Sequence, residues 1–369
     1  MNTNGPYHRR HVFRDLLNPR RLQDTLTLAR QPSLRNAALA GLQAAITIAI
    51  ALPLTLVSPY PHLIGFVSLG ALVALFGRFA PGRGRLRVLV LCALCQVLAV
   101  FGMSFAAWLG TPFTIQLALL ALSCGAFLFI SLTGKFGPPG ALIFVFAAAA
   151  SMSTGTNAAE VLERTAATAV SAILALAICA VSEVFRHHPN AERPFPTDPD
   201  LPVNHRRLIA ARAAFGSGIA VFASYALGAN YPAWAAMGAL AVLQGTHLQL
   251  NLNRAVQRMA GTAAGAALAW ALLVQDPSVW ILIAVLALLQ FLTEVVIGTN
   301  YALGQVLVTP MALLMTHLAA PEVSGPEMAP ERVMDTIVGA VVGICIAVLL
   351  SSLDDRRRLG ERTRKHRDP

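Results

Sequence analysis

Long apolar stretches recur along the whole chain, and short connections rich in charge, glycine or proline separate them. Most of the stretches approach the roughly 20 residues that a helix needs to cross a bilayer. The pattern predicts helices at about 37–57, 62–78, 87–109, 114–133, 139–153, 161–184, 207–227, 232–247, 255–274, 278–297, 301–319 and 333–352. The segments 62–78, 139–153 and 232–247 are short and flanked by glycine or proline, which predicts thin, tilted or broken helices.

Composition agrees with this pattern. Hydrophobic residues make up 56% of the chain, charged residues 12%, and the mean hydropathy is +0.62. These values are typical of a membrane protein with many spans. We therefore expect an all-α polytopic membrane protein of about 12 transmembrane helices.

The basic residues predict an orientation. The formal net charge of +10 could suggest nucleic acid, but the 28 Lys and Arg gather in the two tails and in alternate connections. With the N-terminus inside, all of them except Arg164 and Arg332 lie on the cytoplasmic side, as the positive-inside rule requires. The predicted regions are a basic N-terminal segment at 1–36, spans at 37–185, a cytoplasmic linker at 186–206, spans at 207–352 and a basic cytoplasmic tail at 353–369. Residues 1–36 lack a signal peptide pattern, and we interpret them as an amphipathic surface helix or a disordered tail.

The two halves of the chain resemble one another. The segment GALVALFG at 70–77 matches GALAVLQG at 238–245, and Glu160 with Thr165 matches Glu331 with Thr336. Each half has an even number of spans, so both halves point the same way. We therefore predict two parallel six-helix repeats, related by an axis along the membrane normal, with the transport path between them.

The segment Arg254–Leu273, RAVQRMAGTAAGAALAWALL, is the most informative stretch of the second half. Gly261, Thr262 and Gly265 give one helix face little side-chain bulk, which favours close helix packing in a bilayer. Arg254 and Arg258 share a face because they are one turn apart. They are interpreted either as cytoplasmic anchors or as guards of an anion path.

A few polar and aromatic residues are further candidates for the path. Arg212 and Glu294 lie within predicted spans, where a charge normally faces protein or water, although snorkelling is the alternative. Tyr231 and Trp234 could stack an aromatic ring or belong to an interfacial belt, and Asn300 could donate a hydrogen bond. Arg332 and Asp335 open the last span, and there we favour a structural role because Asp335 suits the positive end of a helix dipole.

The sequence argues against several other chemistries. Cys92 and Cys95 form a C-x-x-C inside an apolar helix, and the five cysteines suit buried apolar positions rather than disulfides or a metal site. Thr133-Gly134-Lys135 lacks the upstream glycine of a phosphate loop. No catalytic constellation is present, so we expect no enzyme, no cofactor and no metal.

Two motifs carry a resemblance to a known family. They are Arg258-x-x-Gly261-Thr262-x-x-Gly265 and Arg332-x-x-Asp335-Thr336-x-x-Gly339-x-x-x-Gly343. Together with the six-plus-six layout, they resemble the fusaric acid resistance and aromatic acid exporter family of bacterial inner-membrane proteins. That family is distantly similar to plant aluminium-activated malate transporters. Many members carry a large cytoplasmic domain after each helical half, which the linker and tail of this chain do not provide.

The resemblance implies gradient-driven export of small organic anions, such as aromatic carboxylic acids, by a multi-pass inner-membrane protein with both termini in the cytoplasm. Arg212, Arg254 and Arg258 would attract the carboxylate, with Gly339 and Gly343 packing the last helix. The alternatives are an uncoupled anion channel and a membrane assembly protein. Expected partners are organic anions and membrane lipids, but not nucleic acid. A homo-oligomer and a periplasmic efflux partner are both left open.

Overall fold

The computed structural model describes residues 31–80, 82–188, 195, 200–245, 248–320 and 325–350, and over these ranges the protein is helical. The predicted N-terminal surface helix and the basic tail lie outside the described residues. In the first half the helices are α3 (Leu34–Val57), η1 (Pro61–Leu63), α4 (Ile64–Ala71), η2 (Leu72–Leu75), α5 (Gly82–Trp108), α6 (Phe113–Gly134), α7 (Leu142–Ala150), α8 (Ala158–Val181) and η3 (Ser182–Phe185). In the second half they are α9 (Val203–Ala226), α10 (Ala233–Leu243), α11 (Leu248–Leu273), α12 (Val279–Ile297), α13 (Tyr301–Ala319) and α14 (Met328–Leu349).

The predicted all-α membrane fold is confirmed. Among the described residues, eight helices are long and apolar enough to cross a membrane, namely α3, α5, α6, α8, α9, α12, α13 and α14. The three segments expected to be short are indeed short, because 62–78 folds as η1, α4 and η2, while α7 and α10 each run for about three turns or fewer.

Local sequence signals place several helix ends. Ser33, Asn157 and Asn300 precede α3, α8 and α13, and each side chain accepts a hydrogen bond from a backbone N–H of the first turn. Lys135 ends α6 in a left-handed conformation with φ 51°. These capping residues set where polar connections interrupt the apolar helices.

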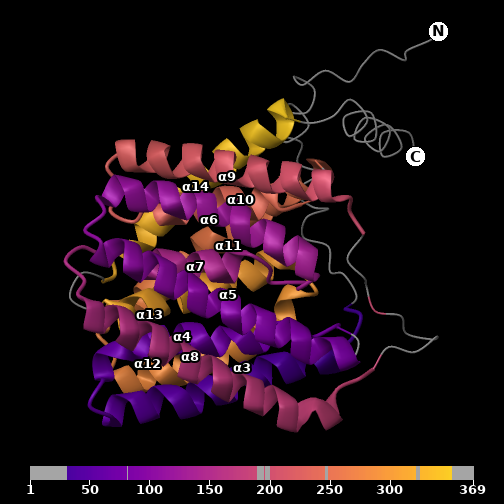
Figure 1. The fold of residues 1–369 in the computed structure, drawn as a ribbon, viewed down its shortest axis with the longest axis vertical. Helices are drawn as coiled ribbons and strands as arrows, with labels where there is room; N and C mark the ends of the chain where they lie inside the picture. Colours follow the sequence, from indigo (N-terminus) through magenta and orange to yellow (C-terminus); the bar gives the residue numbers. More distant parts are fainter. Residues whose placement is uncertain are drawn as a thin grey trace.

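The halves are interlocked rather than side by side. Helix α3 of the first half packs on α12 of the second, and α9 of the second half packs on α6 of the first (Figure 1). Glycine permits both contacts. A Cβ added at Gly41 in α3 would lie 2.8 Å from the Phe291 oxygen, and one added at Gly125 in α6 would lie 2.7 Å from the Ala210 oxygen. The first helix of each half therefore packs against the fourth helix of the other half.

Contacts of the short helices recur between the halves. A Cβ added at Gly70 in α4 would meet the Thr168 oxygen of α8, and one added at Gly238 in α10 would meet the Thr336 oxygen of α14. His62, just before α4, contacts Glu163 of α8. Asn230, just before α10, donates a hydrogen bond to Glu331 of α14. All these pairs are related by the offset that joins GALVALFG to GALAVLQG. In the last helix of each half the structure therefore pairs Glu331 with Glu163, whereas the sequence comparison paired it with Glu160. The axis that relates the repeats stays a prediction.

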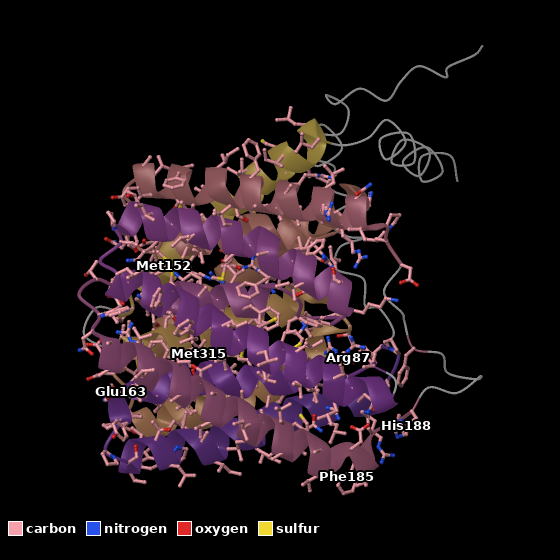
Figure 2. All side chains as sticks on the ribbon, viewed as in Figure 1. Arg87, Met152, Glu163, Phe185, His188 and Met315 are labelled. Carbon is pink, nitrogen blue, oxygen red and sulfur yellow. The ribbon has the colours of Figure 1, made fainter. Side chains whose placement is uncertain are left out.

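The two ends of the helix bundle carry different connections. Figure 2 shows Phe185 and His188 at one end of the molecule and Glu163 at the other. The first two residues follow α8 into the predicted cytoplasmic linker, and Glu163 lies in its first turns. The position of these residues agrees with a single bundle whose helices run from one end to the other.

Candidate functional site

The centre of the candidate site is Arg332, in the second turn of α14. Its guanidinium carbon lies 3.9 Å from the centre of the Trp234 ring in α10. Trp234 in turn stacks on Phe146 of α7, with ring centroids 5.8 Å apart and an interplanar angle of 26°. An arginine within about 6 Å of an aromatic face is held by a cation–π attraction. The stack joins α14 and α10 to a helix of the first half.

Arg332 is buried without an ion pair in the described part of the chain. The residue is 2% exposed, and its Nε and Nη1 atoms have no hydrogen-bond partner among the described residues. A buried charge is unfavourable unless it is paired or hydrogen-bonded. An arginine with unused donors in the interior of a membrane protein is therefore a candidate for a ligand contact.

A second buried arginine faces the same region from α11. Arg258 interacts electrostatically with Arg332, and its Nη1 donates to Gln305 Oε1 of α13 over 3.4 Å. Tyr301, at the start of α13, also interacts electrostatically with Arg332. Hydroxyls near the two arginines are buried and lack partners in the described part of the chain, namely those of Thr262, Thr336 and Tyr301. The region combines two guanidiniums with unused neutral donors.

Asp335 supplies the negative charge closest to this region on α14. Its Oδ1 accepts a hydrogen bond from the Ser224 hydroxyl of α9, and its charge acts on Arg332, while Oδ2 has no partner among the described residues. Two guanidiniums and one carboxylate leave the buried cluster of Arg258, Arg332 and Asp335 with a net positive charge. One further carboxylate would balance these three charges, and Glu331, which interacts electrostatically with Asp335, lies at the edge of the cluster.

The edge of the cluster contains a tyrosine and a glutamate. Glu331 Oε1 accepts a hydrogen bond from the backbone N–H of Tyr231 at 2.6 Å, in the connection between α9 and α10. Burial, followed by the charges of Glu331 and Glu327, raises the pKa of the Tyr231 phenol. The phenol therefore stays neutral at physiological pH and adds no negative charge at this edge.

The first half contains the equivalent arginine, Arg164, and there the guanidinium forms an ion pair with a carboxylate. The guanidinium carbon of Arg164 in α8 lies 5.2 Å from the centre of the Phe66 ring in α4. Its Nη2 donates to Glu160 Oε2 at 2.9 Å and its Nη1 to the Ser153 hydroxyl at 2.9 Å. The position equivalent to Glu160, one turn before Arg332, is Met328. The two halves thus share one Arg–aromatic contact and differ in whether a carboxylate occupies it.

Part of this second half is similar to a known family. Residues 219–346, which include Arg258, Arg332 and Trp234, match the sequence model of the fusaric acid resistance protein-like family. A stretch of 151 residues is also 34% identical to an uncharacterized membrane protein, YvaC of Bacillus subtilis (strain 168), and spans 40% of this chain. The match covers 24% of the length of that relative. No solved structure matches the chain at a significant level.

These findings and the eight candidate spans show a multi-pass membrane protein whose residues 219–346 resemble the fusaric acid resistance protein-like family. The match supports the suspected family over these residues. The distant likeness to plant malate transporters stays a prediction, as do the inner bacterial membrane and the orientation of the termini.

The structure distributes the charged candidates over several places. Arg258 and Trp234 join the cluster, whereas Glu294 lies on α12, where its Oε2 is 2.5 Å from Arg78 Nη1. Arg212 is half-buried on α9, which packs on α6, α10 and α14, whereas Arg258 lies on α11, which packs on α13, α14 and α10. Arg254 is half-buried one turn before Arg258. Glu294 therefore pairs with Arg78, and a shared opening for Arg212, Arg254 and Arg258 stays a prediction.

Asn300 has a structural contact in this arrangement. Its Oδ1 accepts hydrogen bonds from the backbone N–H groups of Ala302 and Leu303, and so it caps the helix that carries Tyr301 and Gln305. The cap helps to place Gln305 beside Arg258 and Tyr301 near Arg332, and the side-chain oxygen of Asn300 serves α13.

The glycines predicted for packing lie against neighbouring helices. A Cβ added at Gly261 would lie 2.4 Å from the Ala302 oxygen, and one at Gly265 would lie 2.6 Å from the Val306 oxygen, both on α13. A Cβ at Gly339 would lie 2.2 Å from the Ala235 oxygen, and one at Gly343 would lie 2.9 Å from Val242 Cβ, both on α10. Thr262 is buried on the same helix as Gly261. Helices α11 and α14, which carry the two arginines, are thus held tightly against α13 and α10.

The sequence analysis favours a structural role for Arg332 at a helix start and does not single it out as a site residue. One signal could have revealed it. If the offset between GALVALFG and GALAVLQG is extended to the last helix of each half, Arg164 aligns with Arg332, Phe66 with Trp234, and Glu160 with Met328. The loss of the acidic partner then becomes visible in the sequence.

Proposed function

We propose that this protein moves small organic anions across the membrane, with Arg332 and Arg258 as the residues that bind the carboxylate. The observation that supports this proposal best is the net positive charge of the buried cluster formed by Arg258, Arg332 and Asp335. Arginine binds a carboxylate through two parallel N–H···O bonds, and Arg332 has unused donors at Nε and Nη1. A carboxylate bound there would balance the charge of the cluster.

The surroundings of Arg332 favour an anion that carries an aromatic ring. Trp234 and Phe146 form a buried stack beside the guanidinium, and rings stack favourably on such surfaces. The family description names resistance to fusaric acid, which is an aromatic carboxylic acid. The proposed substrates are therefore aromatic carboxylates of about the size of benzoate.

We further propose that the direction is export from the cytoplasm and that an ion or proton gradient drives it. The location is the inner membrane of a bacterium, with both termini in the cytoplasm, because the Lys and Arg residues concentrate on one side of the predicted spans. In this orientation Arg332 and Trp234 lie near the outer ends of α14 and α10. Arg258 comes from the half of α11 that begins on the cytoplasmic side.

Flux of radiolabelled benzoate in proteoliposomes tests this function. The variant Arg332→Gln should lower flux per folded protein by about tenfold or more, since charged hydrogen bonds contribute about 1.5–3 kcal/mol. Arg332→Lys should restore part of the flux, because it keeps the charge but not the planar fork. The matched control is Arg87→Gln, at an exposed arginine of α5 outside the cluster, which should leave flux unchanged.

The same experiment separates the alternatives. Unchanged flux per folded protein in Arg332→Gln would remove this residue from the path. Flux that never saturates and does not respond to a proton gradient would identify an uncoupled anion channel. Absence of benzoate flux in the unaltered protein under all gradients would contradict the transport proposal for this substrate class and favour an assembly role.

A further inference from the structure

We propose that the first half holds a second anion site, at Arg164, which the protein closes with its own Glu160 carboxylate. This inference rests on the proposed function, because it assigns to Arg164 the role that Arg332 has in the second half. The two sites are the same contact repeated, with an arginine over an aromatic ring of a short helix. They differ in the residue one turn earlier, which is Glu160 in the first half and Met328 in the second, and in the residue three positions later, which is Ala167 in the first half and Asp335 in the second.

The geometry of Glu160 is that of a bound carboxylate. Its Oε2 accepts from Arg164 Nη2 at 2.9 Å, and its Oε1 accepts from the side-chain nitrogen of Asn157 at 2.8 Å. Asn157 also accepts a hydrogen bond from the Glu160 backbone, which fixes the first turn of α8. Glu160 thus occupies a donor of Arg164 that a free carboxylate would otherwise use.

The rest of the Arg164 site remains suited to an anion. Ser153 Oγ accepts from Arg164 Nη1 and also contacts the Thr156 hydroxyl at 2.6 Å, so the guanidinium would keep its orientation without Glu160. Phe66 lies under the guanidinium as Trp234 does in the second half. The side chain of Arg164 is 17% exposed, so a small anion could reach it once the carboxylate is removed.

The asymmetry gives the protein one open site instead of two. Glu160 is held one turn from Arg164, so its carboxylate competes with a free anion as an intramolecular ligand at high effective concentration. The first half then keeps a rigid Arg–aromatic contact, and the second half keeps the exchangeable one. The ligand class at both places is the same, a small aromatic carboxylate.

Equilibrium dialysis of the purified full-length protein with radiolabelled benzoate tests the inference by stoichiometry. We expect one benzoate per chain in the unaltered protein and two in Glu160→Met, which copies the second half. Met328→Glu should abolish binding, since it gives Arg332 the partner that Arg164 has. The double variant Glu160→Met/Met328→Glu should again bind one benzoate, and Arg164→Gln should then remove it.

The outcomes separate the inference from the proposed function. One site in both the unaltered protein and Glu160→Met would overturn the inference and leave the proposed function standing. No site in the unaltered protein, together with one site in Glu160→Met, would overturn the proposed role of Arg332 and keep the site at Arg164. Two sites in the unaltered protein would show that Glu160 does not close the first one. If Glu160→Met does not fold, Glu160→Gln, which keeps the length of the side chain, provides the same test.

Discussion

Arg78 and Glu294 form an ion pair across the two halves of the protein, with 2.5 Å between Arg78 Nη1 and Glu294 Oε2. Both side chains are buried, and the Arg78 backbone oxygen also accepts a hydrogen bond from Asn36 of α3. The pair lies where α3 packs on α12. The ion pair therefore stabilises the contact between α3 and α12, at the end of the bundle away from the Arg332 stack.

Removing one member of this pair should destabilise the fold. Arg78→Gln leaves the Glu294 carboxylate buried without its cation, and such a loss typically lowers the free energy of unfolding by about 3–5 kcal/mol. The double variant Arg78→Gln/Glu294→Gln should recover much of the loss, because no buried charge is left unpaired. Denaturant titration in micelles measures both. Equal stability of Arg78→Gln and the unaltered protein would argue against a structural role for the pair.

Close helix contact on α11 predicts a difference between two glycine variants. Gly261→Ala places a Cβ 2.4 Å from the Ala302 oxygen, so we expect a loss of about 1–3 kcal/mol from overpacking. Gly102→Ala, in the last third of α5, meets nothing within 4 Å and should be neutral or stabilising by up to about 1 kcal/mol. Thermal unfolding in micelles compares them. A Gly261→Ala protein as stable as Gly102→Ala would show that α11 and α13 can separate easily.

Trp234 should contribute to anion binding through Arg332. Trp234→Phe copies the first half and weakens the cation–π attraction that orients the guanidinium, so we expect the benzoate Kd to rise about twofold to fivefold. The control is Trp270→Phe, because Trp270 is 50% exposed on α11. Tryptophan fluorescence during benzoate titration provides the measurement, and the ligand-induced change should vanish in Trp234→Phe alone. A change that vanishes in Trp270→Phe instead would place the ligand elsewhere.

The orientation can be tested with reporter fusions. Fusions at residue 190 and at the C-terminus, residue 369, should report a cytoplasmic location, because the basic residues concentrate on that side. A reporter inserted at Gly155, in the connection between α7 and α8, should report the opposite side. A periplasmic signal at residue 190 would contradict the predicted orientation.

The sequence predicted the helices better than it predicted the site. Apolar length alone placed the span 114–133, which forms α6 (Phe113–Gly134), because a helix in lipid must satisfy its own backbone hydrogen bonds. It also marked the short segments. It could not show which arginine is buried, since the burial of Arg332 depends on Trp234 and on Phe146, which belong to other helices. The Arg78 partner of Glu294 lies 216 residues away and has no local signature.

The exchange of first helices between the halves also constrains biosynthesis. Glu294 is synthesised 216 residues after Arg78, which at 5–20 residues per second corresponds to about 10 to 40 s. During that interval α3 has emerged from the ribosome while its partner α12 does not yet exist. The first half therefore cannot reach its native packing while it is being synthesised. Helix α3 stays in the membrane without its partner until α12 is inserted. A chain that stops before α12 would leave Arg78 without its partner, so the protein matures only after nearly all of it has been inserted.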